Sequence, residues 1–416
     1  METKVSDFLS QAEQLARKKL WADAADICIK AKEMDATNSY VLNQLGWYLS
    51  RAKRYSEAIE IFKNLMLLEP QKAKWPYMLG YQYYDQQEWK EAISWFDKSL
   101  NLYPEYVVVL YRKGYAHTHL GENEKAINCF LKVVENFQKL DSSKKDKEKN
   151  NYSDSTYQLG KIYLTKGLTR KAEELLSESV EYDQKEAHKY YSYGKALLRN
   201  GKISDAIKSF KNAIRIDSRK DYFKDWLARA YAENGECEKG IKLLEKIPPR
   251  YRSHNIYRTL GEIYLRNENY HDAVSSLLKA TQEQPKNHNY FFLLAKAYLG
   301  NDMPQKAAPL LKKAIELRKA NYKIDFLEAE EYLNSILNDF PGIESLVENE
   351  IEGDGIIKFY KAEKGYGFIS SDEYETDLFF HISSVVNPED IQQGRKAQFD
   401  IEETEKGLSA VSVKIL

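Results

Sequence analysis

The sequence has only three cysteines, no long apolar run and almost no net charge. Cys28, Cys129 and Cys237 are far apart and lack CxxC spacing, so we predict neither a disulfide framework nor a zinc site. Each lies in a helical pattern, where we expect a small core or surface residue. No segment reaches membrane-spanning length, and the N-terminus lacks the apolar stretch of a signal peptide. We therefore expect a cytoplasmic protein.

Catalytic motifs are also missing. The sequence contains no P-loop, no GxSxG and no HExxH, and its seven histidines are dispersed. We therefore expect no enzyme, no catalytic residues, no metal and no cofactor.

The formal charge of −1 conceals an asymmetry. Residues 1–351 carry 55 basic and 50 acidic side chains, whereas residues 352–416 carry 7 and 13, which gives net charges of +5 and −6. No broad basic field marks a nucleic-acid-binding protein, so any such binding must come from local surface chemistry. At 416 residues and 43% hydrophobic content, the chain should fold into at least two globular units.

A small residue recurs along most of the chain at nearly constant spacing. Successive gaps are 34, 34, 34, 46, 34, 34, 33 and 34 residues. A second small residue follows twelve positions later, and a large residue usually follows four positions after that. Stacked helix–turn–helix units are predicted, in which the large residue fills the groove made by the next unit. The first set of small residues is Ala12, Gly46, Gly80, Gly114, Gly160, Gly194, Ala228, Gly261 and Ala295.

This pattern resembles the tetratricopeptide repeat, with about nine units over residues 5–321. The resemblance implies an all-α solenoid, which we assign to residues 1–340. The long gap contains LDSSKKDKEKNN at 140–151, which we interpret as a solvated loop inserted between two repeats; the alternative is a basic loop that touches nucleic acid. Residues 322–340 should form a capping helix, and residues 341–351 a linker.

In tetratricopeptide repeats, positions five and nine of each first helix usually point into a concave groove. By this resemblance, the groove is aromatic toward the N-terminus and cationic toward the C-terminus. An extended acidic peptide or a single RNA strand would fit such a surface, although individual tyrosines could simply pad the helix packing. The expected partner-binding residues are Trp47, Tyr77, Tyr81, Tyr111, Tyr115, Tyr157, Lys161, Tyr191, Lys195, Arg229 and Lys296.

From Gly355 onward, the pattern changes from helical to alternating, which predicts five short β-strands in a small all-β barrel of the OB type. In KGYGFI at 364–369, alternation places Lys364, Tyr366 and Phe368 on one face, and the intervening glycines should leave the rings accessible. In DLFFHI at 377–382, alternation likewise pairs Phe379 with His381. Rings on neighbouring strands would form a platform on which bases stack.

These two motifs are similar to those of the cold-shock domain, and the resemblance covers residues 352–416, including a closing pattern with Lys406 and Gly407. It implies binding of single-stranded RNA or DNA, and it adds Lys358 and Phe359 to the expected platform. The family usually has Trp at the position of Phe359 and often an aromatic at the position of Ile382. Together with the net charge of −6, these departures predict weak, salt-dependent binding.

Two functions remain open. In the first, the chain is an adaptor or regulator whose barrel binds a single strand, expected to be RNA, while the repeats recruit a protein or extend the RNA surface. In the second, it is a protein-interaction scaffold whose barrel has lost nucleic-acid binding. Neither the oligomeric state nor the identity of the partner follows from the sequence.

Overall fold

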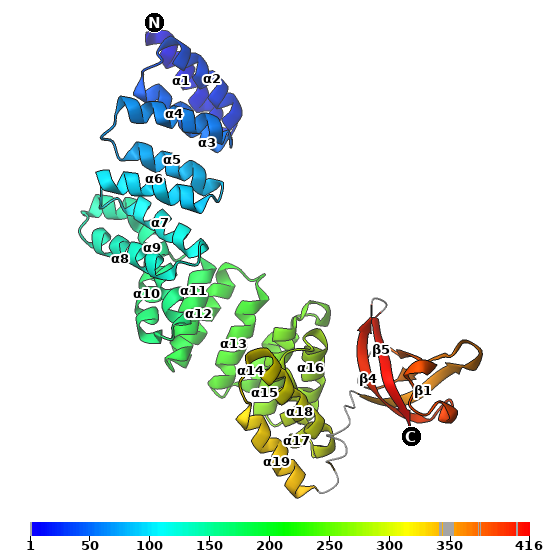
Figure 1. Cartoon of the computed structure of the whole chain (residues 1–416). Coiled ribbons are helices and arrows are strands. Elements are labelled where there is room, and N and C mark those ends of the chain that lie inside the picture. The colour runs from blue at the N-terminus through cyan, green and yellow to red at the C-terminus, as the bar shows by residue number, and fades with distance from the viewer. Residues whose placement is uncertain (1, 341–342, 344–352, 373, 375, 405–406) are drawn as a thin grey trace. The chain divides into compact units, whose positions relative to one another are not determined.

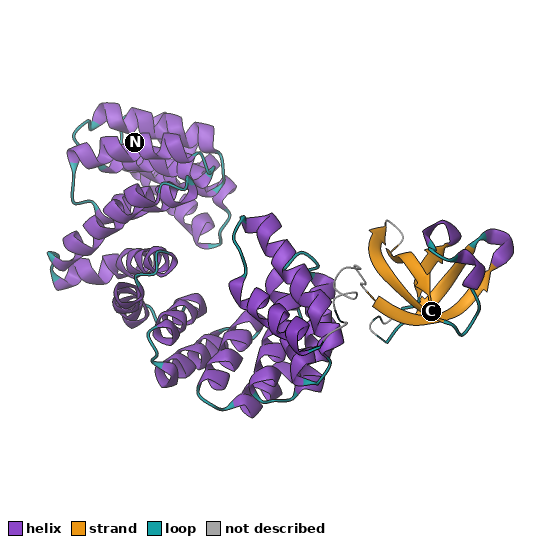
Figure 2. Cartoon of the chain, turned by 60° about the horizontal axis from the view of Figure 1, so that its bottom comes forward, coloured by secondary structure: helices purple, strands orange, loops and turns teal. Residues whose placement is uncertain are grey.

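The computed structural model describes the chain apart from residues 1, 341–342, 344–352, 373, 375 and 405–406. Within the described residues, α-helices come first and five β-strands follow (Figure 1). Figure 2 shows the same division, with helices in purple and strands in orange. The predicted fold class, a helical-repeat array followed by a small all-β barrel, is confirmed. Most of the predicted linker at 341–351 lies outside the described residues.

Packing divides the chain into two compact units, Met1–Arg219 and Lys220–Leu416, and each is considered by itself. The helices of the first unit are α1 (Glu2–Arg17), α2 (Trp21–Met34), α3 (Ser39–Arg51), α4 (Tyr55–Leu68), α5 (Lys74–Asp85), α6 (Trp89–Leu102), α7 (Val107–His119), α8 (Asn123–Gln138), α9 (Ser142–Thr165), α10 (Thr169–Tyr182), α11 (Ala187–Arg199) and α12 (Ile203–Ile216). The helices of the second unit are α13 (Asp221–Glu233), α14 (Cys237–Glu245), α15 (His254–Arg266), α16 (Tyr270–Glu283), α17 (His288–Gly300), α18 (Pro304–Tyr322) and α19 (Leu327–Asp339).

Each repeat is a helix pair, and in most repeats a large side chain of the second helix packs on a glycine of the first. A Cβ atom on Gly46 would lie 2.7 Å from the ring of Phe62, and a Cβ on Gly114 would lie 2.7 Å from the ring of Phe130. Phe62 and Phe130 thus close the hairpin of their own repeat, because a residue without a side chain leaves room for the ring. Phe62 also shares an apolar cluster with Leu79 of the next repeat, and Phe130 shares one with Leu159, which agrees with our expectation that the large residue fills the groove of the next unit.

The lysine-rich insertion is helical rather than a loop. Residues 142–151 begin α9, which has 24 residues where α11 has 13. The carboxylate of Asp141 accepts a hydrogen bond from the Lys144 backbone N–H, which satisfies a free donor at the start of the helix. Lys149 pairs with Asp146 one turn away at 2.8 Å. The prediction of a loop failed because lysine and glutamate also favour helices.

The last repeat is covered by α19, which packs Ala329 and Ile336 into the same apolar cluster as α17 and α18. This helix begins at Leu327, not at residue 322 as we expected, because α18 continues to Tyr322. Lys323 follows in the left-handed conformation with φ +55°, which ends α18.

The three cysteines are buried in helices, as predicted from their patterns. Burial raises the pKa of the Cys28 thiol to about 12.

The C-terminal strands close into a barrel in the order β1-β2-β3-β5-β4. The strands are β1 (Gly353–Lys361), β2 (Tyr366–Ser370), β3 (Leu378–His381), β4 (Lys396–Thr404) and β5 (Gly407–Ile415). One residue in two points inward, so Ile357, Ile369, Leu378 and Phe380 are fully buried in the barrel core. Closure leaves the alternate residues of β1, β2 and β3 on the outside.

Candidate nucleic-acid interface

Three neighbouring strands of the barrel bring the predicted binding residues together. β1 and β2 pair so that Phe359 lies opposite Phe368, and β2 and β3 pair so that Phe368 lies opposite Phe379. Tyr366 lies opposite His381 in the same β2–β3 ladder. Residues directly opposite each other in antiparallel strands share one face and lie about 5 Å apart. All five side chains therefore belong to one surface.

The four rings of this surface contact one another. The ring centre of Tyr366 lies 6.0 Å from that of Phe379, 6.2 Å from that of Phe368 and 6.3 Å from that of Phe359. Phe359 and Phe379 are nevertheless 43% and 38% exposed. We call Phe359, Tyr366, Phe368 and Phe379 the aromatic platform. Adjacent apolar rings that stay open to water indicate a surface that binds another molecule.

A β-bulge explains how two consecutive residues of β1 both face outward. The β1–β2 register shifts between Ile357 and Phe359, which leaves Lys358 as the extra residue. Strict alternation would bury either Lys358 or Phe359, but both are exposed. The bulge therefore places a lysine next to the first ring of the platform.

Gly367 has a different role from the one we expected. It is buried, and a Cβ atom there would lie 2.4 Å from the Phe359 carbonyl oxygen and 2.5 Å from the ring of Phe380. The residue must be glycine because β1 and the core ring of Phe380 approach it closely from inside the barrel. Gly367 therefore faces the core, and it does not itself leave the rings accessible as we expected.

His381 lies exposed at the end of β3, beside Tyr366. Its Nδ1 accepts the backbone N–H of Ser383 at 3.3 Å and lies 2.8 Å from the Ser383 hydroxyl. An Nδ1 atom that accepts a hydrogen bond leaves the proton of the neutral ring on Nε2. The Nε2 N–H is thus positioned to donate to a ligand on the platform.

The cations around the platform are not equally available. Lys358 Nζ lies 2.7 Å from Asp377 Oδ2, so its charge is already compensated. Lys364 is exposed, and Lys361 lies opposite Tyr366 in the β1–β2 ladder. Neither Lys361 nor Lys364 makes an ion pair with any residue that the structure describes. We had not predicted Lys361, although its spacing of two from Phe359 places it on the same side of β1.

Comparison with known proteins agrees with this geometry. The family profile of the 'Cold-shock' DNA-binding domain matches residues 353–416, and the profile of the tetratricopeptide repeat matches residues 157–221, 194–254 and 258–322. The chain is a tetratricopeptide-repeat array followed by a cold-shock domain. Lys406, which belongs to the closing pattern of the cold-shock resemblance, lies outside the described residues.

The curated relatives match the cold-shock domain. Cold shock-like protein CspG of Shewanella violacea is 36% identical over 64 residues, which are 15% of this chain and 91% of that protein. A cold shock-like protein of Aquifex aeolicus is 34% identical over 64 residues, which are again 15% of this chain and 91% of that protein. Upstream, the profile of anaphase-promoting complex, cyclosome, subunit 3 matches residues 51–133.

Solved structures resemble the repeat array only distantly. The C-terminal part of a TPR repeat-containing protein from Cytophaga hutchinsonii is 18% identical, and the match covers 69% of this chain and 98% of that one at a TM-score of 0.39. This likeness carries no weight for function. The profiles that match are those of the tetratricopeptide repeat, anaphase-promoting complex subunit 3 and the cold-shock domain, and no enzyme family is among them.

The predicted aromatic residues of the repeats lie on the first helices, which form one face of each unit. In the first unit, α7 contacts α9, and α9 contacts α11. Rings also bridge α5 and α7, since the ring centres of Tyr84 and Tyr115 are 5.9 Å apart. We call the surface that carries these predicted aromatic residues the first-helix face; they are Trp47, Tyr77, Tyr81, Tyr111, Tyr115, Tyr157 and Tyr191. Tyr111 serves packing in part, because its ring lies 6.3 Å from Phe130 and its hydroxyl donates to Asp154 at 3.3 Å.

Several rings of the first-helix face carry a cation one helical turn away. Lys161 Nζ lies 5.1 Å from the ring centre of Tyr157, and Lys195 Nζ lies 5.4 Å from that of Tyr191. Trp47 is 40% exposed, and the Arg51 guanidinium lies 5.8 Å from its ring centre. For the two lysines this spacing follows from positions five and nine, which are neighbours on a helix, and Arg51 likewise lies four residues after Trp47.

In the second unit, the predicted cations are compensated by carboxylates. Arg229 pairs with Asp225 at 2.9 Å and donates to the Thr259 hydroxyl at 3.1 Å. Lys296 lies 3.8 Å from Glu328 and 5.4 Å from the ring centre of Phe292. Arg229 and Lys296 are therefore less available to an anion than the sequence indicated.

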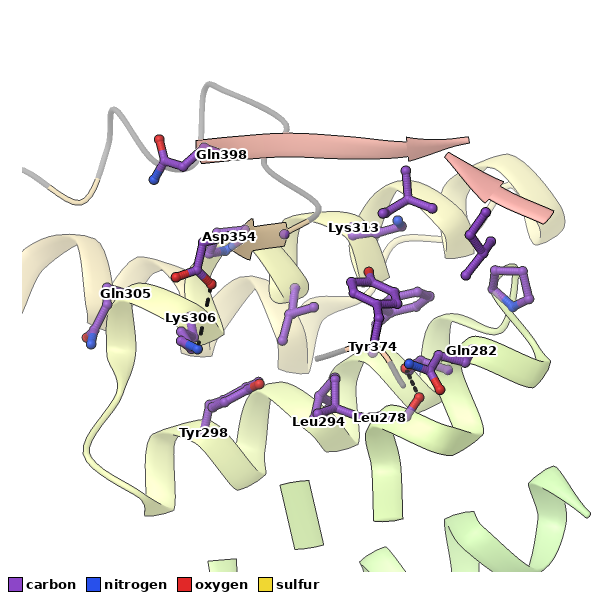
Figure 3. Close-up of a pocket in the computed structure, with 18 of the residues that line it drawn as sticks. Leu278, Gln282, Leu294, Tyr298, Gln305, Lys306, Lys313, Asp354, Tyr374 and Gln398 are labelled. Atoms are coloured by element: carbon purple, nitrogen blue, oxygen red, sulfur yellow. Dashed lines mark hydrogen bonds and ion pairs between the residues drawn. The ribbon is translucent and has the colours of Figure 1, made fainter. Parts of the chain in front are cut away.

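The second unit also contains a pocket, shown in Figure 3. Its lining includes Leu278, Leu294 and Tyr298 from the helices, together with Asp354 and Gln398 from the barrel strands. No residue of the aromatic platform lines it. The platform is thus separate from this pocket.

The described residues show neither a metal-binding cluster nor a membrane-spanning helix. No cluster of three or more histidine, cysteine or acidic side chains there is arranged to hold a metal ion. None of the described helices is both long and apolar enough to cross a membrane.

Proposed function

We propose that the cold-shock domain binds single-stranded nucleic acid, with RNA as the expected ligand, while the repeats recruit a protein partner or extend the RNA surface. The observation that carries the proposal is the aromatic platform, whose four adjacent rings share the outer face of β1, β2 and β3. Stacking on such rings stabilises a bound strand by roughly 1–3 kcal/mol per base and tolerates many base sequences. The chain would then act as an adaptor.

Polar groups around the platform support the same function. Lys361 and Lys364 would contact the phosphates, and the Nε2 N–H of His381 would donate to a base or phosphate. The net charge of −6 for residues 352–416 opposes a polyanion. We therefore expect weak binding that falls steeply as salt increases.

Two substitutions on the platform test the proposal. Phe368→Ala and Phe379→Ala should each weaken binding of labelled oligo-U and oligo-T by roughly 5- to 150-fold, the equivalent of one lost stacking contact. Fluorescence anisotropy of the full chain at about 50 mM salt measures the dissociation constants. Retention of wild-type affinity by both variants would contradict a platform-centred site.

A matched control is available on the same barrel. Val386 is 67% exposed and does not belong to the platform, so Val386→Ala removes apolar surface without removing a stacking ring. Its oligonucleotide affinity should match that of the wild type. Circular dichroism of each variant shows whether the barrel remains folded.

A second candidate function is a protein-interaction scaffold with a barrel that does not bind nucleic acid. The pairing of Lys358 with Asp377 favours it, because a basic group next to the platform is already compensated. Titration of oligo-U and oligo-T into the full chain and into residues 352–416 separates the two. Absence of binding by both at low salt would favour the scaffold.

A further inference from the structure

Arg112 of α7 is held by three tyrosines of the neighbouring helix α5. Its guanidinium carbon lies 4.5 Å from the ring centre of Tyr81 and 5.2 Å from that of Tyr84. Its Nε donates to the hydroxyl of Tyr77 at 3.1 Å. We call these four residues the Arg112 cluster. The tyrosines orient the guanidinium, and none of the described carboxylates forms an ion pair with it.

Two nearby cations of the first unit are compensated by carboxylates. Lys113, the next residue along α7, pairs with Asp97 at 2.5 Å, and the buried Lys189 pairs with Asp154 at 2.7 Å. Arg112 makes no ion pair with any described carboxylate. A partly buried guanidinium has lost some of its water and gains most from an added anion, so its environment favours a bound carboxylate.

A second arginine on the same face is in a similar position. Arg51 of α3 lies over the rings of Trp21 and Trp47, at 5.2 and 5.8 Å, and likewise makes no ion pair among the described residues. Asp85 lies near both arginines. Burial raises the pKa of Asp85 above its usual value, although the Tyr81 hydroxyl and the charges of Arg112 and Arg51 act to lower it. Two cations and one acid leave this part of the face with a positive charge.

The arrangement of the rings distinguishes a peptide from a nucleic acid. Tyr81 and Tyr84 stack on each other at an interplanar angle of 15°, and Trp89 stacks on His119 at 4.5 Å. The guanidinium of Arg112 also lies over the rings of Tyr81 and Tyr84, which covers part of their faces. Bases need open ring faces, whereas carboxylates need N–H and O–H donors. The cluster offers donors but few open faces.

We propose that the Arg112 cluster is the docking site for an extended acidic peptide segment of a protein partner, with Arg112 binding a carboxylate of that segment. The guanidinium would engage the carboxylate through two parallel N–H donors, with Arg51 contacting a second acidic side chain. The proposal rests on the proposed function in one respect, namely that the repeats bind a protein. It goes further by naming the chemistry of the bound segment and the residues that select it.

The test uses defined probes and the full-length chain. A labelled poly-glutamate peptide of about ten residues, blocked at both ends, should bind at low salt, and a poly-glutamine peptide of the same length should not. Arg112→Gln should weaken poly-glutamate binding by about tenfold or more. Arg112→Lys keeps the charge but loses the two-pronged donor, so it should also weaken binding. Fluorescence anisotropy gives each dissociation constant.

Two further variants keep the proposal testable if substitution of Arg112 disturbs the fold. Arg51→Gln alters an exposed side chain and should weaken poly-glutamate binding by a few-fold. Arg170→Gln removes an exposed arginine from the second helix α10 and should leave the affinity unchanged. Thermal melts followed by circular dichroism verify that each variant is folded.

The contrary outcomes are distinct. Failure of the wild type to bind poly-glutamate, equal binding of poly-glutamine, or equal weakening by Arg170→Gln would overturn the docking site. Loss of oligo-U binding in Arg112→Lys would assign the cluster to RNA instead. Phe368→Ala and Phe379→Ala should weaken only oligo-U binding, so failure of the peptide site and failure of the nucleic-acid site are separately visible.

Discussion

The aromatic platform of the cold-shock domain and the Arg112 cluster of the repeats use similar side chains in different ways. On the platform, Phe359 and Phe379 are 43% and 38% exposed, and no cation covers them in the described structure. In the Arg112 cluster, Tyr81 and Tyr84 stack on each other and carry a guanidinium over their faces. Open faces suit bases, and covered faces with free donors suit carboxylates.

The comparison shows that counting aromatic residues does not identify a ligand. Three roles occur in one chain: rings that fill a hairpin, rings that orient a cation and rings that remain open. Phe130 and Tyr81 belong to neighbouring repeats, yet the first is fully buried and the second is only partly buried. The contacts of each ring decide its role, and the following predictions separate the roles by experiment.

The largest expected effect separates buried rings from open ones. Phe130→Ala should lower the local free energy of unfolding around α7 and α8 by about 3–5 kcal/mol, because it empties the space against Gly114. Phe379→Ala should cost the barrel only about 1 kcal/mol, since much of its ring is already in water. Hydrogen–deuterium exchange of peptides from α8 and β3 in the full chain measures both effects.

Binding assays complete this comparison. Phe130→Ala should keep the wild-type affinity for oligo-U, whereas Phe379→Ala should weaken it. Equal loss of exchange protection in α8 and β3, or loss of oligo-U binding by Phe130→Ala, would show that the two classes of ring are not distinct. Leu131→Ala in α8 is the control, because Leu131 is 44% exposed and should change neither measurement.

The next effect separates a cation with carboxylate partners from one without. Lys189 is fully buried and pairs with Asp154 at 2.7 Å and Asp183 at 2.9 Å. Lys189→Met should lower the free energy of unfolding of the first unit by about 2 kcal/mol at neutral pH, since two partly buried carboxylates lose their counterion. Arg112→Gln should cost less stability and should mainly weaken peptide binding. Urea unfolding of the two variants checks this order.

The cost of Lys189→Met should depend on pH. Burial acts to raise the pKa of Asp183, but the hydrogen bonds from Lys189 and from the Lys185 backbone N–H outweigh it, so the pKa is lowered below 3.8. A carboxyl with a lowered pKa in the folded state contributes stability above its ordinary pKa and loses it as pH falls through the lowered value. The destabilisation by Lys189→Met should therefore shrink below about pH 4. A cost that stays constant down to pH 2 would contradict the ion-pair explanation.

Much of the architecture could be predicted from the sequence because periodicity reports packing directly. The 34-residue spacing of Gly46, Gly80 and Gly114 predicted the helix pairs, since each pair needs one close contact. Spacing alone does not say that the large residue also packs on the glycine of its own repeat, as Phe62 and Phe130 do. The insertion at 140–151 was misassigned because a polar, lysine-rich composition fits a solvated helix and a loop equally well.

The candidate sites were predictable to different degrees. Alternation within β2 and β3 was sufficient to group Tyr366, Phe368 and Phe379, because strand residues two apart share a face. Alternation could not explain why Lys358 and Phe359 both face outward, which requires the bulge in β1. Arg112 was not predicted at all. Its significance is that none of the described carboxylates forms an ion pair with it, and a missing partner leaves no trace in the spacing of residues.

The smallest expected effect concerns a cation that the cold-shock domain already compensates. Asp377→Asn should release Lys358 from its 2.7 Å ion pair and tighten oligo-U binding about two- to fivefold at low salt, as expected for an exposed pair. Because one more cation could then contact a phosphate, the plot of log affinity against log salt should steepen by about 0.7. Asp390→Asn is the matched control, since it makes the same change of charge where Asp390 faces Arg395 at 3.7 Å. An equal gain in both variants would attribute the effect to net charge, and the platform would then lack a specific role for Lys358.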